Sequence, residues 1–299
     1  MDKSRLSGLV IVKKEEGMTS QAVVNRVKRI MNIDKAGHTG TLDPLATGVL
    51  PVLIGRAVKA SEFMLSADKH YGATLLLGEE RDTEDVTGEL ISYSESVPSE
   101  DEVMAVIPNF VGRIMQTPPM YSALKIGGKK LCDLAREGIT VDREPREITV
   151  LSLTARKISE REYFLDVHCS KGTYIRTLCA DIGKALGVGG VMKTLVRLSA
   201  SGFSIDEAHT LGEIEAMSDK ERESIVIGVE RIFDSLPSVT LPDFFARLAS
   251  SGLEIYQKKI NTSFELGTRV KLYSKCGFFA VGEVRDYDDG TAIKPIRQF

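Results

Sequence analysis

The chain has 299 residues, enough to form one large domain and a smaller one. Hydrophobic residues make up 42% and charged residues 27%, as in an ordinary globular protein, and no apolar run approaches the roughly 20 residues that a membrane helix needs. The formal net charge of −3 does not exclude a nucleic-acid partner, because residues 1–60 hold ten Lys and Arg against five Asp and Glu and can form a locally basic face.

The cysteines and histidines are scattered along the chain. None of the four cysteines has the CxxC spacing of a zinc or redox motif, and the four histidines are equally dispersed. The N-terminal segment carries charges but only a short apolar run, so we expect no secretory signal there. We therefore expect a cytoplasmic protein with reduced thiols, without a metal and without association with membranes.

The N-terminal part of the chain predicts a strand followed by a helix. Residues 8–12 form a short apolar run between Gly8 and two lysines, which is typical of a buried strand. Thr19 or Ser20 can cap the next element, in which apolar residues recur at helical spacing over residues 23–31.

Residues 37–51 read GHTGTLDPLATGVLP. A Gly/Thr loop leads to the apolar Leu42 and then delivers the carboxylate of Asp43, whose backbone is pushed towards an extended conformation by Pro44. Taken alone, an Asp-Pro pair is most often a helix cap with proline at the first helical position. A reacting carboxylate is the alternative, and the dipeptide does not decide between the two.

Strands and helices continue to alternate after this loop. Residues 49–55 and 68–78 have the pattern of strands, the second with Tyr71 near its start, and residues 56–65 have the pattern of a helix. Residues 79–102 contain ten acidic residues against Arg81 alone. We expect these charges to repel RNA and to lie away from any RNA-binding face.

The next segment combines helices with an extended stretch. A short amphipathic helix is predicted over residues 103–110, and two prolines favour an extended conformation over residues 117–125, before helical spacing resumes at Leu131. A basic cluster suited to phosphates lies here, made of Lys125, Lys129, Lys130 and Arg136.

Residues 163–169 alternate like a strand, and a helix with one buried stripe follows, which Thr173 can cap. Tyr174 and Arg176 lie off that stripe, in the first turn. A cation in the first turn opposes the helix dipole by a few tenths of a kcal/mol. We therefore expect Arg176 to have a carboxylate partner.

The last third of the chain predicts a domain boundary. Residues 191–198, which include Leu195, and residues 206–234 have helical patterns. Residues 235–242 contain two prolines, and alternating strands with glycine turns follow them. We therefore expect two domains, residues 1–236 and residues 237–299.

Several of these strings resemble one family. GHTGTLDPLATGVLP, the TPPMYSALK that starts at residue 117 and the SKGTYIRTLCADIG that starts at residue 170 are similar to motifs of the TruB family of tRNA pseudouridine synthases. The resemblance covers most of residues 9–200, and it implies, against the charge argument, that the GxxxxTxDxxG-like segment of residues 78–88 lies beside the active site. It implies an α+β fold with a catalytic domain of pseudouridine synthase type, built on a mixed, mostly antiparallel sheet. The C-terminal residues resemble the small β-barrel-like PUA domain, which binds RNA.

The resemblance also implies roles for six residues. Asp43 corresponds to the catalytic carboxylate and Arg176 to the cation that pairs with it, while Tyr71 stacks on the target base and takes part in removing the proton of carbon 5. The remaining contacts to the base and to the RNA fall to Tyr174, Leu195 and His38, the last of which fills the gap left by the displaced base.

The sequence departs from the family pattern at two places. The family has a Lys-Pro-x-Gly element where this chain reads Lys14-Glu15-Glu16-Gly17, so the proline is missing and the positioning role of Lys14 is left open. Cys132 stands where an aromatic residue is usual.

The implied substrate is uridine 55 in the T-loop of elongator tRNAs, so the expected partner is the T-arm stem-loop, with no obligate protein partner. Pseudouridine formation moves the ribose from a uracil nitrogen to carbon 5, with nothing oxidised or imported, so no cofactor is expected. One ionised carboxylate must act at the ribose, either as nucleophile or as base. Arg176 can keep Asp43 ionised away from water and can pair with it bidentately.

Flipping the base out of the RNA costs a few kcal/mol, and stacking on Tyr71 offsets about 1–3 kcal/mol of this cost. Two other classes of function compete. A non-catalytic tRNA-binding or tRNA-folding protein would need no shielded carboxylate at all. An aspartate-based hydrolase would need a second carboxylate or a metal cluster, neither of which stands out in the sequence.

Overall fold

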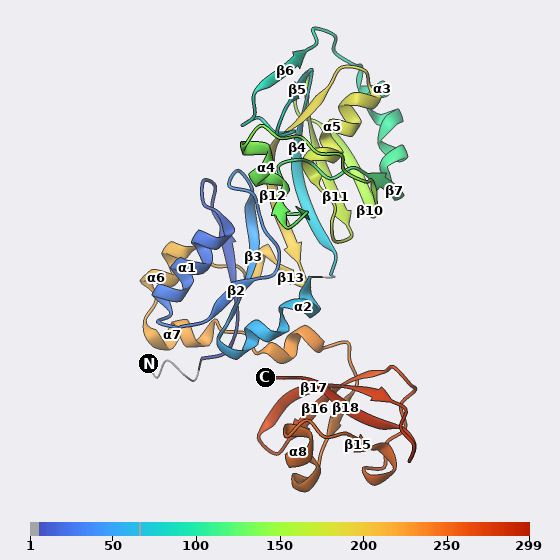
Figure 1. Cartoon of the computed structure of the whole chain (residues 1–299). Helices are drawn as coiled ribbons and strands as arrows, with labels where there is room; N and C mark the ends of the chain where they lie inside the picture. The colour runs from blue at the N-terminus through green and yellow to red at the C-terminus, as the bar shows by residue number, and fades with distance from the viewer. Residues whose placement is uncertain (1–5, 66) are drawn as a thin grey trace.

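The computed structural model describes residues 6–65 and 67–299, and a long twisted sheet organises most of them (Figure 1). Within these residues the sheet has nine strands in the order β1-β3-β12-β4-β11-β10-β7, with β2 paired to β3 and β13 paired to β12. The strands are β1 (Gly8–Lys14), β2 (Ala36–His38), β3 (Thr47–Ile54), β4 (Lys69–Leu77), β7 (Gly112–Gln116), β10 (Arg146–Lys157), β11 (Glu162–Cys169), β12 (Gly190–Ala200) and β13 (Phe203–Ser204).

The pairing of the strands is antiparallel except between β3 and β12, which run parallel. The prediction of a mixed, mostly antiparallel sheet is therefore confirmed. The single parallel pair brings the start of β3, just after the Asp43 loop, beside the end of β12. Two segments that are about 150 residues apart in the sequence thus meet at the middle of the sheet.

Helices cover the sheet. Helix α1 packs against β2 and β3, and α5 packs against β12 and β4. The predicted cap of α1 is confirmed, because the Thr19 hydroxyl accepts a hydrogen bond from the Ala22 amide. The helical segments are α1 (Ser20–Ile30), η1 (Gly55–Ala60), α2 (Ser61–Met64), α3 (Glu100–Val106), η2 (Ile107–Phe110), α5 (Ile175–Ala185), η3 (Ile205–Glu207), α6 (Leu211–Ala216), α7 (Asp219–Ser224) and η4 (Val229–Phe233).

The prediction of a helix over residues 191–198 is wrong, because this segment is the central strand β12. Its register against β4 shifts twice, between Met192 and Thr194 and between Arg197 and Ser199. A β-bulge inserts an extra residue and breaks the two-residue alternation by which a strand is recognised. The remaining apolar spacing imitates a helix, and pairing with β3 and β4 decides the outcome.

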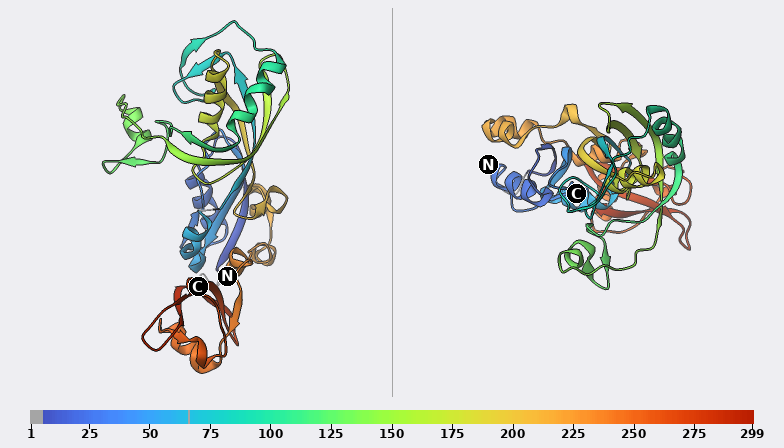
Figure 2. Two further views of the ribbon diagram at one scale, coloured as in Figure 1. Left: turned by 90° about the vertical axis from the view of Figure 1, so that its right-hand side faces the viewer. Right: turned by 90° about the horizontal axis from the view of Figure 1, so that it is seen from above.

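Residues 117–145 form a segment that projects sideways from the sheet (Figure 2). It contains β8 (Lys125–Ile126), β9 (Lys129–Lys130) and α4 (Leu131–Arg136), and thus carries the predicted basic cluster. A second small hairpin, β5 (Glu79–Arg81) and β6 (Leu90–Tyr93), holds part of the acidic segment.

Residues from 238 onwards form a separate curled sheet at the end of the molecule that carries the C-terminus (Figure 1). Its order is β14-β16-β17-β18-β15. An apolar cluster joins it to the rest of the chain: Phe233 of η4 packs against Phe63, Phe278 and Phe299, with ring centroids 5.1–5.9 Å apart. The elements are β14 (Ser238–Thr240), α8 (Asp243–Ser250), β15 (Ile255–Tyr256), η5 (Gln257–Lys259), β16 (Arg269–Ser274), β17 (Gly277–Arg285) and β18 (Ala292–Gln298). None of the described helices is long and apolar enough to cross a membrane.

Candidate active site

A cavity of about 560 Å³ lies where the Asp43 loop, the loop between β5 and β6, the start of α5 and strands β4 and β12 meet. Five of the six residues singled out in the sequence line it: Asp43, Tyr71, Tyr174, Arg176 and Leu195. His38 lies on β2, and its ring nitrogen Nδ1 is 3.4 Å from the amide nitrogen of Gly40, a residue of the cavity wall. Partial burial, and secondarily the positive charge of Arg197, lower the pKa of the His38 imidazole.

The loop that carries Asp43 is held in one conformation by a serine of α1. The buried Ser20 hydroxyl accepts a hydrogen bond from the Leu42 amide at 2.8 Å and donates one to the Leu42 carbonyl at 3.0 Å. No helix follows Asp43 in this described stretch; the chain bends through Pro44 and enters β3. Asp43 is therefore not a helix cap, and its carboxylate faces the cavity.

The side chain of Lys14 also holds the Asp43 loop in place. Its side chain is buried, and Nζ donates to the carbonyls of Glu15, Pro44 and Ala46 at 2.9, 3.1 and 2.6 Å. Burial lowers the pKa of the ammonium to about 8, and the negative charge of Asp43 opposes this shift. Lys14 therefore has a fixed position although the family's proline is missing after it.

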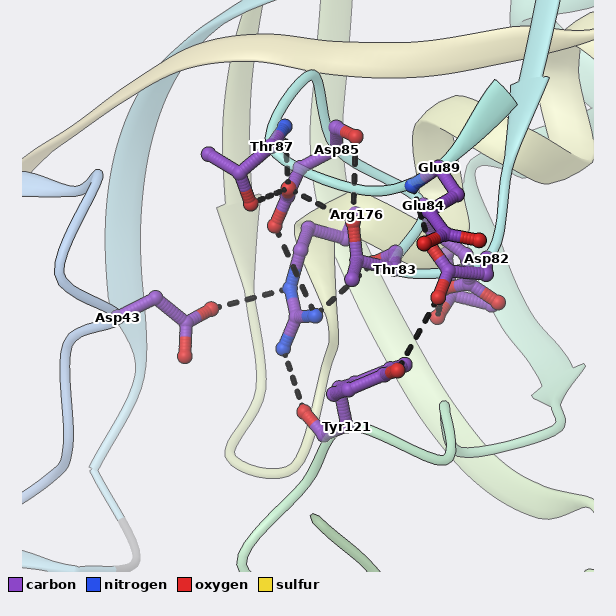
Figure 3. Close-up of polar contacts among 10 residues, drawn as sticks. Asp43, Asp82, Thr83, Glu84, Asp85, Thr87, Glu89, Tyr121 and Arg176 are labelled. Carbon is purple, nitrogen blue, oxygen red and sulfur yellow. Dashed lines mark hydrogen bonds and ion pairs between the residues drawn. The ribbon is translucent and has the colours of Figure 1, made fainter. Parts of the chain in front are cut away.

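Arg176 joins three separate segments through one guanidinium (Figure 3). Its Nε lies 3.0 Å from Oδ2 of Asp43, while Nη1 donates to the Thr83 carbonyl at 2.9 Å and Nη2 donates to the Tyr121 carbonyl at 2.8 Å. The expected carboxylate partner is thus present. The expected bidentate geometry is wrong, because the two terminal nitrogens are occupied by backbone carbonyls and only Nε contacts Asp43.

The two partners differ in exposure. The Arg176 side chain is 6% exposed, whereas that of Asp43 is 39% exposed. The cation is therefore fixed by the protein, and the carboxylate points into the space where a substrate would enter. This arrangement suits an anion that has to act on a bound molecule while its partner stays in place.

Asp85 is a second carboxylate at the guanidinium, with Oδ2 3.8 Å from Nη1 of Arg176. Its other oxygen accepts hydrogen bonds from the Thr83 hydroxyl at 2.8 Å and from the amide and hydroxyl of Thr87 at 3.0 and 2.5 Å. The expectation that the acidic segment lies away from the site is wrong. Its summed charge is misleading, because Asp85 is neutralised within the protein, and the TxDxxG spacing was the better signal.

The start of α5 also differs from the prediction. Tyr174, not Thr173, is the N-cap, and its side chain accepts no capping hydrogen bond. The backbone is satisfied by buried Gln116 of β7, whose Oε1 accepts from the Tyr174 amide at 2.8 Å and whose Nε2 donates to the Tyr174 carbonyl at 3.1 Å. Arg176 lies in the first turn, as predicted.

Arg197 is a cavity residue that the sequence patterns did not reveal. It is 1% exposed, and its guanidinium donates to the carbonyl of Val49 at 2.7 Å and to that of Gly40 at 3.1 Å. Burial raises the pKa of the Tyr71 phenol, and the neighbouring Arg197, which shares a hydrogen bond with it, opposes the rise. Arg197 follows Leu195 on the same face of β12, a relation that the helical interpretation concealed.

Among the described residues, no group of three His, Cys, Asp or Glu side chains lies close enough together to hold a metal ion. The groups that line the cavity include the accessible carboxylate of Asp43, the buried guanidinium groups of Arg176 and Arg197, three tyrosines and an apolar wall from Leu195. Such a set can bind a planar base and act on an electrophilic carbon beside it.

Chains in two solved complexes share this fold. A chain in the crystal structure of a Cbf5-Nop10-Gar1 complex matches with a TM-score of 0.73 and 26% identity, over 97% of this chain and 84% of that one. A chain in an H/ACA RNP bound to a substrate RNA containing 2′-deoxyuridine matches with a TM-score of 0.72 and 25% identity, over 98% of this chain and 84% of that one. The fold is thus the mixed α/β fold of pseudouridine synthases.

Sequence comparisons narrow the class to a family. The model of the TruB family pseudouridylate synthase N-terminal domain matches residues 28–175, and that of the tRNA pseudouridylate synthase B C-terminal domain matches residues 176–238. The tRNA pseudouridine synthase B of Alkaliphilus oremlandii is 41% identical over 95% of each chain, and that of Methylobacillus flagellatus is 38% identical over 94% of this chain and 92% of its own. This chain belongs to the TruB family of pseudouridylate synthases.

Proposed function

We propose that this protein is an isomerase that converts uridine 55 in the T-loop of elongator tRNAs to pseudouridine. The observation that carries the proposal is the pair of Asp43 and Arg176, 3.0 Å apart, at the wall of a cavity large enough for one nucleoside. Membership of the TruB family and the tRNA substrate in the names of the relatives support it.

In the proposed reaction Asp43 acts on the ribose, either as nucleophile or as base, while the bond from the base nitrogen to the sugar breaks. In both versions Asp43 loses its negative charge, and Arg176 remains beside Asp85 and two carbonyls. The detached uracil then turns within the cavity and rejoins the ribose through carbon 5, as the ester to Asp43 breaks or Asp43 returns its proton to the ribose. Carbon 5 finally loses its proton, and the nitrogen that left the ribose gains one. Leu195 and the ring of Tyr71 keep the uracil in place while it turns.

Tyr71 is proposed to stack on the flipped uracil. The raised pKa of its phenol keeps it protonated at neutral pH, so stacking is the role that burial favours. Removal of the carbon 5 proton would need the ionised phenol, which only the Arg197 contact favours. The two roles are separable by substitution.

The proposed RNA partner is the T-arm stem-loop. Arg136 lines the cavity, and three lysines of the same projecting segment lie exposed on its hairpin, where they can contact phosphates. His38 is proposed to occupy the gap left by the flipped base.

Residues 237–299 are proposed to be a PUA-like RNA-binding domain that follows the catalytic domain of residues 1–236 in the chain. A cytoplasmic location fits the four free cysteines, as disulfides are rare there.

The proposal is tested by tritium release from a tRNA transcript labelled at carbon 5 of uridine, combined with mapping of the modified position. Stoichiometric release with pseudouridine at position 55 is expected. A binding or folding protein would bind the transcript without releasing tritium, and an aspartate-based hydrolase would liberate free uracil. Either of these results would overturn the proposed function.

A further inference from the structure

Glu84 has an unusual backbone conformation at the centre of the loop between β5 and β6. Its φ is +62°, in the left-handed region. This region favours glycine and, after it, the short polar residues asparagine and aspartate, because other side chains crowd the backbone there. A strained position occupied by a long side chain indicates that the side chain is used.

The side chain of Glu84 binds the residue next to Arg176. Its Oε2 accepts a hydrogen bond from the hydroxyl of Thr177 at 2.5 Å, and Thr177 is buried in the first turn of α5. The backbone of Glu84 binds a different element, because its carbonyl accepts from the amide of Met192 in β12 at 3.0 Å. Glu84 therefore ties the loop to both elements that line the cavity.

The left-handed turn has a consequence for the neighbours of Glu84. Thr83 presents its carbonyl to Nη1 of Arg176, and Asp85 presents Oδ2 to the same nitrogen. Three successive residues thus face the first turn of α5. Thr83 and Asp85 lie at the guanidinium of Arg176 (Figure 3), and Glu84 binds Thr177. An extended backbone would direct consecutive residues to opposite sides.

We propose that Glu84 is a positioning residue for the uridine isomerisation, whose carboxylate clamps the 83–85 loop to Thr177 so that Arg176 keeps Nε aimed at Asp43. The kinetic part of this proposal rests on the proposed function. Its geometric part concerns only the orientation of Arg176.

The clamp is sensitive to charge. The charges of Arg176 and Asp181 of α5 and of Arg143 of the projecting segment act on the Glu84 carboxyl, and Glu84 in turn acts on the Cys179 thiol of α5. Partial burial raises the pKa of Glu84, with Asp181 adding to the rise, while the Thr177 hydrogen bond and the two arginines oppose it. The ionised carboxylate is a stronger acceptor for the Thr177 hydroxyl than the neutral carboxyl, so the clamp weakens, without being lost, as the pH falls through this raised pKa.

The decisive variant is Glu84→Gly, because glycine relieves the backbone strain and removes only the clamp. We expect its melting temperature to equal or exceed that of the parent, its tRNA dissociation constant to stay within twofold, and its single-turnover rate at saturating tRNA to fall at least tenfold. The single-turnover rate of Glu84→Gln should fall less, since the amide oxygen still accepts from Thr177. The pH–rate profile of this variant should lack the decrease at low pH that protonation of Glu84 causes in the parent. Glu89→Gln, an exposed glutamate of the same loop, is the matched control.

Two further measurements keep the proposal falsifiable. Thr177→Val removes the donor without changing the loop backbone, and it should lower the rate as Glu84→Gly does. Hydrogen exchange of the Arg176 Nε–H by NMR should be slow in the parent and faster in Glu84→Gly, with no change in Glu89→Gln. Parental rates in Glu84→Gly or Thr177→Val, or unchanged exchange, would overturn the clamp. A parent without any turnover of tRNA would overturn the proposed function instead, and the exchange measurement would still decide the clamp.

Discussion

Arg176→Lys tests the part of the site that the geometry defines best. The substitution keeps the positive charge and removes the guanidinium, which in the parent contacts three acceptors at 2.8–3.0 Å on the segments of Asp43, Thr83 and Tyr121. A single ammonium on a shorter stem leaves at least two of these acceptors without a donor. Each unsatisfied buried acceptor costs about 1–3 kcal/mol. Because the cavity admits water, we expect a loss of about 2–3 kcal/mol in the free energy of unfolding.

The effect on catalysis should be larger than the effect on stability. Without the guanidinium the Asp43 carboxylate is no longer held relative to the ribose, and a displacement of about 1 Å costs about 10²-fold in rate. Urea unfolding measures the first quantity, and single-turnover tritium release at saturating tRNA measures the second. Arg113→Lys, on the exposed surface of edge strand β7, is the matched control and should leave both unchanged. If Arg176→Lys kept parental stability and turnover, the guanidinium would not be the element that orders this site.

Three further predictions follow from the same contacts. Tyr71→Phe should bind tRNA as the parent does. Its turnover should fall more than tenfold only if the hydroxyl acts on the carbon 5 proton, and turnover equal to that of the parent would leave stacking as the sole role. Tyr71→Leu should lose both binding and turnover. Truncation after residue 236 removes Phe278 and Phe299, two of the three aromatic partners of Phe233, which is 3% exposed, and should lower the free energy of unfolding by about 2–4 kcal/mol. The single-turnover rate of the fragment at saturating tRNA should stay within threefold, and a much slower folded fragment would place the C-terminal sheet in the catalytic unit. Lys14 has a folded pKa of about 8, below its ordinary value of 10.5, so unfolding takes up a proton between these two pH values. The free energy of unfolding of the parent relative to Lys14→Met should therefore rise from pH 8 to pH 10. A difference in stability that does not change with pH would show that the ammonium is not desolvated.

The pairing of Asp43 with Arg176 could be anticipated because Arg176 violates a local rule and the family resemblance identifies Asp43 as its partner. A cation in the first turn of α5 is unfavourable without an anionic partner, and the loop motif supplies that anion. The geometry of the pair could not be anticipated. The carbonyls that occupy the terminal nitrogens belong to Thr83 and Tyr121, which are 93 and 55 residues away in the sequence.

Other errors have a common physical origin, which is that tertiary pairing overrides a local pattern. The bulges of β12 erase its alternation, so the local pattern predicts a helix and does not place Arg197 on the same face as Leu195. The summed charge of the acidic segment predicts a position away from the site, whereas the hydrogen bonds of Asp85 make one of its carboxylates a part of the site. The position of Lys14 depends on three backbone carbonyls, one of which belongs to Glu15, and it does not require a proline at residue 15.

The central claim is that the Asp43 carboxylate carries out the isomerisation in the cavity that Arg176 orders. Its most direct test is single-turnover tritium release by Asp43→Asn at saturating tRNA labelled at carbon 5 of uridine, with tRNA affinity measured in parallel. Because the amide keeps the shape and loses only the charge, we predict tRNA binding within several-fold of the parent and no tritium release. Turnover by the purified variant above the level of contaminating enzyme would contradict the claim and remove Asp43 from the chemistry.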